Sequence, residues 1–224
     1  MTPGPDPELA TVLVFGSTGT AGTGVLEACA RDGRVGEVRA VARRPLSVAH
    51  PKVREVRCSD FSDLAPIAEE LTGVAACLFC LGTSVRNVRD EAEYRTIHVT
   101  YPLMAARALR KHSPGATFVY LSGAGASRRS SMMWARVKAE AEDELAALSL
   151  ARLVCVRPGG IVPRTPTGFE RWFLAPLIRV IPALGIGAEE LGRAMLAAGL
   201  GRPAPAEGAV LENRALKSLA VRSP

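Results

Sequence analysis

Ser122, Trp134 and Lys138 are the side chains whose types and spacing first point to chemistry. Ser122 follows an apolar run that ends at Leu121, and the motif Trp134-Ala-Arg-Val-Lys138 falls in a helical pattern shortly after it. Residues four positions apart share one face of a helix, so the indole and the ammonium group are expected side by side. A phenol can exchange a proton once a nearby cation lowers its pKa from about 10, whereas an indole N–H only donates hydrogen bonds. These residues therefore offer polar contacts but no tyrosine for proton transfer.

The elements that must position these side chains follow an alternating pattern. Short apolar runs alternate with longer helical patterns, which is typical of parallel strands joined by crossover helices. Strands are predicted at Val12–Phe15, Val38–Ala42, Val53–Arg57, Val74–Leu81, Thr117–Leu121 and Leu153–Val156. Helices are predicted at Gly22–Arg31, Leu64–Leu71, Glu91–Lys111 and Ser131–Leu148. The pattern predicts an α/β fold with a doubly wound parallel sheet of the Rossmann type.

A glycine-rich loop follows the first predicted strand and opens the first helix. Glycines in this position allow a tight turn, and the free N–H groups at the helix N-terminus attract a pyrophosphate. An ordinary strand-to-helix turn is the alternative. The residues expected to hold the cofactor here are Gly16, Thr18, Gly19, Thr20, Ala21 and Gly22.

Two arginines at the end of the second predicted strand bear on the choice of cofactor. An acidic residue there would hold the ribose 2′-hydroxyl of NAD, but this chain has Ala42-Arg43-Arg44. Guanidinium groups suit a 2′-phosphate, so the sequence predicts a preference for NADP over NAD. Arg43 is the stronger candidate for the contact with the 2′-phosphate. Arg44 precedes Pro45, and the alternative for it is that it only faces water.

Length and composition predict one domain. The chain has 224 residues, of which 48% are hydrophobic and 22% charged, enough for one substantial core. Residues 1–9 are expected to form a disordered lead-in. After Val156 the pattern is irregular, with a helix predicted near Ala188–Leu200, a short strand near Val210–Leu211 and a last helical turn. We expect residues from about 158 to 224 to form a small cap on the substrate side of the sheet.

Charge and cysteine content exclude several function classes. The net charge is +6, but the arginines are scattered without interleaved aromatic residues, so nucleic-acid binding is not expected. Apolar runs are too short to cross a bilayer, and the N-terminus lacks a signal-peptide pattern. Five cysteines, an odd number, favour reduced thiols and a cytoplasmic protein. Cys77 and Cys80 lie within one predicted strand and should point to opposite faces, which argues against a redox pair.

Several of these motifs together resemble the atypical short-chain dehydrogenase/reductase family, in particular its Tat-interacting-protein-like oxidoreductases. They are the G-x-x-G-x-x-G spacing of the glycine loop, Cys80-Leu81-Gly82-Thr83-Ser84, Leu121-Ser122, Val137-Lys138 and Arg157-Pro158-Gly159. Members of this family carry a serine followed by Tyr-x-x-x-Lys, and Trp134 stands at the tyrosine position. The usual proton donor is therefore missing.

The resemblance implies further roles. Leu81, Gly82 and Thr83 would pass beneath the cofactor, Lys138 would bind the nicotinamide ribose, and Ser122 would orient a substrate carbonyl. The residues that would line the nicotinamide are Pro158, Gly159, Gly160 and Ile161. Asp60 and Phe61 would lie at the adenine. Alternatives are a cap or turn for Asp60 and Ser122, and an exposed helix charge for Lys138.

His98, Tyr94 and Tyr120 are the other candidates for proton transfer. A histidine can titrate near neutral pH, although a packed or exposed helix residue is the alternative for His98. The tyrosines depend on geometry that a sequence does not give. The Gly123–Ser130 loop is expected to be a mobile lid with arginines that are solvated or reach an anion. Three histidines without neighbouring ligands predict no metal site.

Two functions follow from these observations. The first is an NADP-dependent oxidoreductase that acts on a small carbonyl or alcohol, with protons handled by Ser122, water or His98. The alternative is a non-catalytic NADP(H)-binding sensor or regulatory protein, because Trp134 replaces the tyrosine. An epimerase or dehydratase is disfavoured, since it would need the same tyrosine and a larger sugar-nucleotide domain. The sequence specifies neither the substrate, a protein partner nor the oligomeric state.

Overall fold

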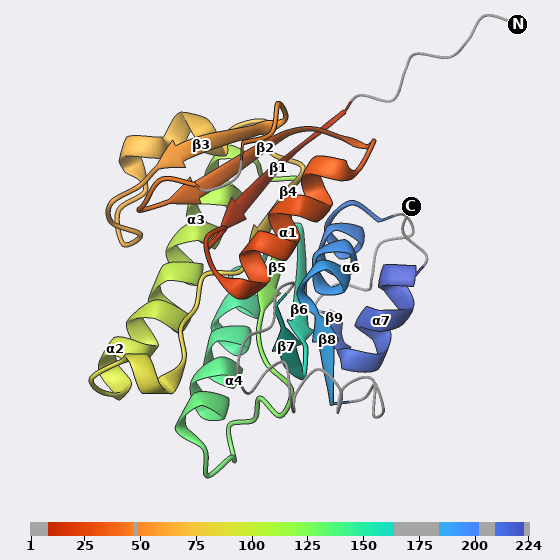
Figure 1. The fold of residues 1–224 in the computed structure, drawn as a ribbon. Coiled ribbons are helices and arrows are strands. Elements are labelled where there is room, and N and C mark those ends of the chain that lie inside the picture. The colour runs from red at the N-terminus through yellow and green to blue at the C-terminus, as the bar shows by residue number, and fades with distance from the viewer. Residues whose placement is uncertain (1–8, 47–48, 164–183, 202–208, 222–224) are drawn as a thin grey trace, which may run out of the picture.

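Seven parallel strands form one sheet in the computed structural model, which describes residues 9–46, 49–163, 184–201 and 209–221. The strand order is β3-β2-β1-β4-β5-β6-β9, so the chain crosses over at β1 and winds outward in both directions (Figure 1). The strands are β1 (Ala10–Phe15), β2 (Val35–Ala42), β3 (Val53–Arg57), β4 (Ala76–Phe79), β5 (Thr117–Leu121), β6 (Arg152–Arg157) and β9 (Ala209–Glu212). This arrangement confirms the predicted doubly wound Rossmann-type fold.

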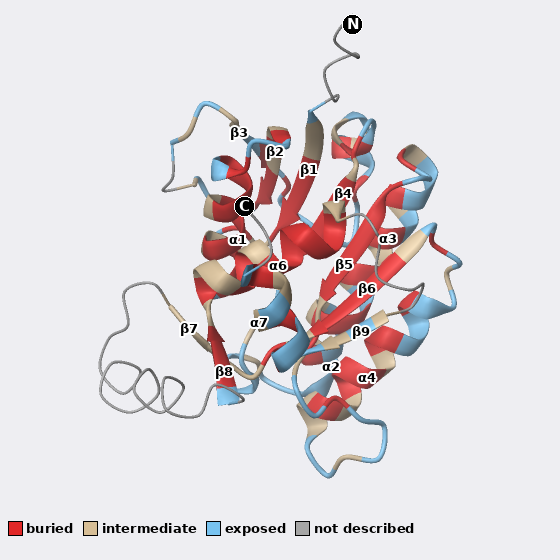
Figure 2. Cartoon of the chain, turned by 90° about the vertical axis from the view of Figure 1, so that its right-hand side faces the viewer, coloured by how far each residue is buried: buried red, intermediate tan, exposed pale blue. Residues whose placement is uncertain are grey.

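The central strands are apolar on both faces because helices cover both (Figure 2). Along β1, Val12 and Val14 point into one hydrophobic cluster, and Leu13 and Phe15 point into the other. All four are fully buried. Alternation along a strand thus divides one continuous apolar run between two cores.

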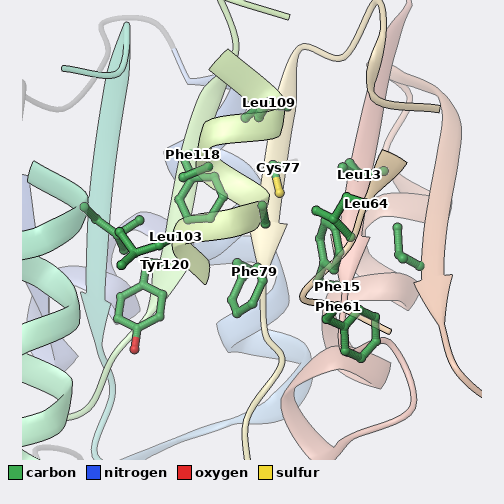
Figure 3. Close-up of a cluster of buried hydrophobic side chains, with 14 of the residues drawn as sticks. Leu13, Phe15, Phe61, Leu64, Cys77, Phe79, Leu103, Leu109, Phe118 and Tyr120 are labelled. Carbon is green, nitrogen blue, oxygen red and sulfur yellow. The ribbon is translucent and has the colours of Figure 1, made fainter. Parts of the chain in front are cut away.

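Each face of the sheet has its own set of helices. One face carries α1 (Thr20–Arg31), α6 (Ala188–Leu200) and α7 (Asn213–Val221). The other carries η1 (Ala65–Leu71), α2 (Glu91–Arg95), η3 (Thr96–Thr100), α3 (Tyr101–His112) and α4 (Met133–Ala146). Aromatic side chains concentrate on this second face, where Phe15, Phe79, Phe118 and Tyr120 follow one another across the strands (Figure 3).

Several predicted elements differ in detail from the structure. The helix predicted at Glu91–Lys111 consists of α2, the π-helical turn η3 and α3, which has Pro102 in its first turn. The strand predicted at Val74–Leu81 is shorter, because the chain turns away after Phe79 to pass against the glycine loop. The short helix η2 (Val85–Asn87) follows that turn.

The C-terminal third contributes to the sheet as well as to its surroundings. β9 pairs in parallel with β6 at the sheet edge, and α6 has the predicted bounds and packs closely on α1. A second small sheet is formed by β7 (Gly160–Val162) and β8 (Gly185–Gly187). The apolar segment between residues 169 and 181 lies outside the described residues, as does most of the expected lead-in, residues 1–8.

Cys77 and Cys80 lie in opposite hydrophobic clusters, as the sequence predicts, and both thiols are free. Within the described ranges, no helix has the length and apolar character needed to span a bilayer. The same residues hold no cluster of three or more histidine, cysteine or carboxylate side chains that would bind a metal ion.

Candidate functional site

A cavity of about 750 Å³ lies at the carboxyl ends of the central strands. Loops after β1, β2, β3 and β4 form one part of it, and η2, α2, η3 and α3 form the rest. The residues that line it are Gly16, Thr18, Gly19, Arg43, Arg44, Phe61, Cys80, Leu81, Gly82, Thr83, Asn87, Arg89, Asp90, Ala92, Glu93, Thr96, Ile97 and Tyr101. This is the edge at which open α/β sheets bind ligands.

The glycine loop requires its glycines for steric reasons. Gly16 has a φ of +78°, and a Cβ at this residue would lie 2.5 Å from the backbone nitrogen of Leu81. A Cβ on Gly22 would lie 2.0 Å from the carbonyl oxygen of Gly16. Both contacts are too short for any other residue, so the loop packs directly on α1 and on the chain after β4.

The N-terminus of α1 has no acidic side chain in its own cap or first turn. Gly19 is the capping residue and supplies no side-chain hydrogen bond, and the first turn has no acidic residue. The free N–H groups and the positive end of the helix dipole therefore remain available to a negatively charged ligand. Gly16, Thr18 and Gly19 line the cavity at this point.

Arg43 and Arg44 both line the cavity, and Phe61 lies between the cavity and the core. The Arg43 guanidinium carbon is 5.6 Å from the centroid of the Phe61 ring. Asp60 is exposed, and its carboxylate accepts hydrogen bonds from the Ser62 backbone and hydroxyl at 2.8 and 2.6 Å. Asp60 therefore stabilises a local turn, which the sequence analysis gave as the alternative to a contact with the adenine.

His98 supports the cavity floor instead of titrating. Its Nε2 lies 3.2 Å from the Thr83 backbone nitrogen and 3.1 Å from the Thr83 carbonyl oxygen, and its ring packs against Gly82. Burial, reinforced by the charge of Lys138, lowers the pKa of His98 to about 2. His98 is thus the packed helix residue that the sequence analysis gave as the alternative to a titrating group, and burial favours its neutral imidazole, which contacts the Gly82–Thr83 segment.

Lys138 is buried, not an exposed charge on α4. Its Nζ donates a hydrogen bond to the Leu121 carbonyl oxygen at 2.7 Å and lies 3.4 Å from the Tyr120 hydroxyl. The Nζ is also 4.9 Å from the centroid of the Tyr120 ring. Burial lowers the pKa of Lys138 to about 7, and the nearby carboxylate of Glu142 is hydrogen-bonded to Arg157. The ammonium group thus lies beside the Leu121–Ser122 peptide with no carboxylate in direct contact among the described residues.

Neither buried tyrosine restores the missing acid. The Tyr120 hydroxyl donates to the His98 carbonyl oxygen at 2.9 Å, and burial raises its pKa well above the usual value. The Tyr94 ring packs on the His98 ring with centroids 4.1 Å apart, and burial raises the pKa of Tyr94 to about 12. The Tyr120–Lys138 contact joins β5 to α4, which sequence spacing does not reveal.

Trp134 packs on the loop after β5. A Cβ on Gly123 would be 3.4 Å from the indole ring, and one on Gly125 would be 3.9 Å from it, so the glycines leave room for the indole. Ser122, beside this loop, has a buried hydroxyl with no hydrogen-bond partner among the described residues. Its hydroxyl is therefore free to bind a ligand or a water molecule.

The Gly123–Ser130 loop makes hydrogen bonds with its surroundings at several points. The Ala124 N–H donates to the Pro158 carbonyl oxygen at 2.9 Å, and the Ser127 N–H donates to the Ala135 carbonyl oxygen at 3.0 Å. Arg128 binds the Asp143 carboxylate at 2.7 Å. This arginine is therefore paired with its own protein.

The Pro158–Ile161 segment is fixed by a residue that sequence reasoning missed. The Asn213 side chain accepts a hydrogen bond from the Gly159 N–H and donates one to the Gly185 carbonyl oxygen, both at 3.1 Å. A Cβ on Gly159 would lie 2.3 Å from the Leu184 carbonyl oxygen. The described lining of the cavity does not include this segment, Ser122 or Lys138, so their contacts with a cofactor stay predictions.

Comparison with known proteins gives distant relatives. No model of a known protein family matches the chain. Protein FMP52-1, mitochondrial, from Scheffersomyces stipitis is 28% identical over 150 residues, which are 66% of this chain and 66% of that protein. Protein FMP52, mitochondrial, from Debaryomyces hansenii is 26% identical over 72% of this chain and 74% of its own. Leucinostatins biosynthesis cluster protein T from Purpureocillium lilacinum is 25% identical over 94% of each chain. The expected cytoplasmic localisation is contradicted by the FMP52 relatives, which are named mitochondrial.

Solved structures with the same fold are short-chain dehydrogenase/reductase-like Rossmann proteins. A short-chain dehydrogenase from Burkholderia cenocepacia in complex with NADP has a TM-score of 0.68 at 20% identity, over 95% of this chain and 92% of its own. Uronate dehydrogenase from Agrobacterium tumefaciens has a TM-score of 0.69 at 16% identity, over 92% of this chain and 76% of its own. MoeE5 in complex with UDP-glucose and NAD has a TM-score of 0.70 at 18% identity, over 91% of this chain and 75% of its own. Two of these three neighbours hold NADP or NAD. At identities this low, the likeness establishes the fold alone.

Proposed function

We propose that the chain is an NADP(H)-binding protein of the short-chain dehydrogenase type that acts as an oxidoreductase on a small carbonyl or alcohol. The observation that carries the proposal is a single cavity lined by two groups that suit anions. One is the open N-terminus of α1, and the other is the pair Arg43 and Arg44. A dinucleotide with a pyrophosphate and a 2′-phosphate has matching charges.

The choice of NADP over NAD is supported by the arginines themselves. Arg43 and Arg44 make no ion pair with any residue of the described ranges, whereas Arg54 and Arg57 on the neighbouring strand contact glutamates. Charge-assisted hydrogen bonds from guanidinium N–H groups are worth about 1.5–3 kcal/mol each. One such bond to a 2′-phosphate would favour NADPH over NADH by about tenfold or more.

Proton transfer is assigned to Lys138 and Ser122. A bound nicotinamide would supply or accept the hydride. The Ser122 hydroxyl, which lacks a protein partner in the described residues, would hold the substrate oxygen. Burial makes Tyr94 and Tyr120 weaker acids than a free phenol and keeps His98 neutral, whereas it lowers the pKa of Lys138 to about 7. Lys138 is therefore the group that would give a proton to the substrate oxygen, directly or through water.

A non-catalytic NADP(H)-binding protein is the second candidate. It is favoured by the indole of Trp134 at the expected tyrosine position and by the hydrogen bond that directs Lys138 toward the Leu121 carbonyl oxygen. In this case the dinucleotide would serve in sensing or in control of a partner. The resemblance to the Tat-interacting-protein-like branch is compatible with either candidate.

The two candidates differ in their response to three variants. Wild type, Lys138→Ala and Trp134→Tyr should be assayed with NADPH against a panel of small aldehydes and ketones. Turnover by wild type that is lost in Lys138→Ala supports the oxidoreductase. Turnover by Trp134→Tyr alone identifies the natural chain as a binding protein. If none of the three turns over any carbonyl, the oxidoreductase proposal is rejected.

A further inference from the structure

Arg43 is held in place by an aromatic ring, and this ring belongs to the site. Its guanidinium carbon lies 5.6 Å from the centroid of Phe61, within the range of a cation–π contact. Within the described part of the chain, the Arg43 side chain contacts the Phe61 ring. In that same part, its guanidinium N–H groups make no hydrogen bond or ion pair. The guanidinium is thus positioned while its donors stay free.

Phe61 is itself fixed from two sides. It is 3% exposed and meets Phe15 edge-on at 6.0 Å between ring centroids and Tyr101 edge-on at 5.7 Å. Phe15 comes from β1 and Tyr101 from α3, so the ring is clamped between the sheet and a helix. Figure 3 shows Phe61 next to Phe15, at the opposite end of the aromatic row from Tyr120.

The neighbouring arginines are held in a different way. Arg39 on β2 and Arg54 on β3 bind Glu37 and Glu70, so their N–H groups are occupied by carboxylates. A carboxylate partner for Arg43 would hold it equally well but would compete with a phosphate. An aromatic face orients a guanidinium without occupying its in-plane donors.

We propose that Phe61 is a specificity-determining residue that positions Arg43 for the 2′-phosphate of the dinucleotide. The inference rests on the proposed NADP(H)-binding function and extends it. Removing the ring should weaken binding of the cofactor that carries the 2′-phosphate and leave the other unchanged. A residue that merely packed on the adenine would affect both cofactors equally.

Binding of NADPH, NADH, 2′,5′-ADP and ADP should be measured by calorimetry on wild type, Phe61→Leu, Phe61→Tyr and Arg43→Ala. A cation–π contact at an exposed site corresponds to about a two- to fivefold change in affinity. We expect Phe61→Leu to lower the NADPH/NADH and 2′,5′-ADP/ADP affinity ratios by that factor. Phe61→Tyr, which keeps the ring, should retain both ratios. In the double variant with Arg43→Ala, Phe61→Leu should have no further effect on them.

Phe118→Leu is the matched control, because Phe118 is a buried ring of the same cluster that does not line the cavity. It should lower the melting temperature without changing either ratio. An unchanged ratio in folded Phe61→Leu, or equal losses for both members of each pair, would overturn the inference while leaving dinucleotide binding intact. Failure of wild type to bind any of the four nucleotides would reject the proposed function, and this inference with it.

Discussion

At the scale of single residues, the chemistry of this site depends on what is buried. Lys138 lies in the core with its Nζ on the Leu121 carbonyl oxygen, and His98 and Tyr120 lie close by with shifted pKa values. The titratable groups that face Lys138 are Cys80 directly after β4, Tyr120 from β5, Cys155 from β6, Glu142 from α4 and His98 from η3. Burial outweighs these neighbours and makes the neutral amine accessible near pH 7.

The lowered pKa of Lys138 predicts a pH-dependent stability. Between about 7 and about 10 the unfolded chain holds a proton on this lysine that the folded chain has lost, so the free energy of unfolding rises with pH in that window. Relative to Lys138→Met, wild type should gain up to about 1.4 kcal/mol per pH unit. Chemical denaturation of both proteins at several pH values measures this gain. A difference that does not vary with pH would show that Lys138 titrates normally.

Tyr120→Phe tests the contact between β5, η3 and α4. The change removes the donor to the His98 carbonyl oxygen and an oxygen beside Lys138, and should lower the free energy of unfolding by about 1–3 kcal/mol. Tyr94→Phe is the control, since Tyr94 is also buried but makes ring contacts with His98. Equal losses in the two variants would contradict a specific role for the Tyr120 hydroxyl.

At the scale of elements, the glycine loop and α1 form one rigid unit. Gly22→Ala would place a methyl group 2.0 Å from the Gly16 carbonyl oxygen, and either the loop or the helix would have to move. We expect NADPH affinity to fall by at least about tenfold, because the pyrophosphate contacts depend on this backbone. Gly33→Ala has nothing within 4 Å of the new methyl group and should bind like wild type. Titration of both variants with NADPH measures this difference in affinity. Normal NADPH affinity in Gly22→Ala would show that the pyrophosphate binds elsewhere.

The elements show how far the sequence could predict the structure. The apolar runs within β1, β5 and β6 are easily recognised because burial on both faces of the sheet makes the middle of each strand almost entirely apolar. Arg43 and the glycine loop could be predicted because they follow directly from strand ends. The contacts of Lys138 with Tyr120 and of Asn213 with Gly159 could not be predicted, because they depend on how a helix packs against a strand or loop in three dimensions.

At the scale of the whole molecule, cofactor and fold should be thermodynamically linked. The glycine loop, Arg43 and the chain after β4 come from separate segments and form the cavity only when the sheet is folded. A nucleotide that binds this cavity must therefore stabilise the folded state, by about 2.7 kcal/mol at a concentration of 100 times the Kd. Thermal unfolding with and without NADPH should show a higher melting temperature with the nucleotide, and a smaller increase at the same NADPH concentration in Gly22→Ala.

The most direct test of the central claim is a calorimetric titration of the wild-type chain with NADPH and NADH, repeated on Arg43→Ala. The account predicts saturable binding at one site, a preference for NADPH of about tenfold or more, and loss of that preference in Arg43→Ala. Absence of saturable binding for both nucleotides in wild type would contradict it.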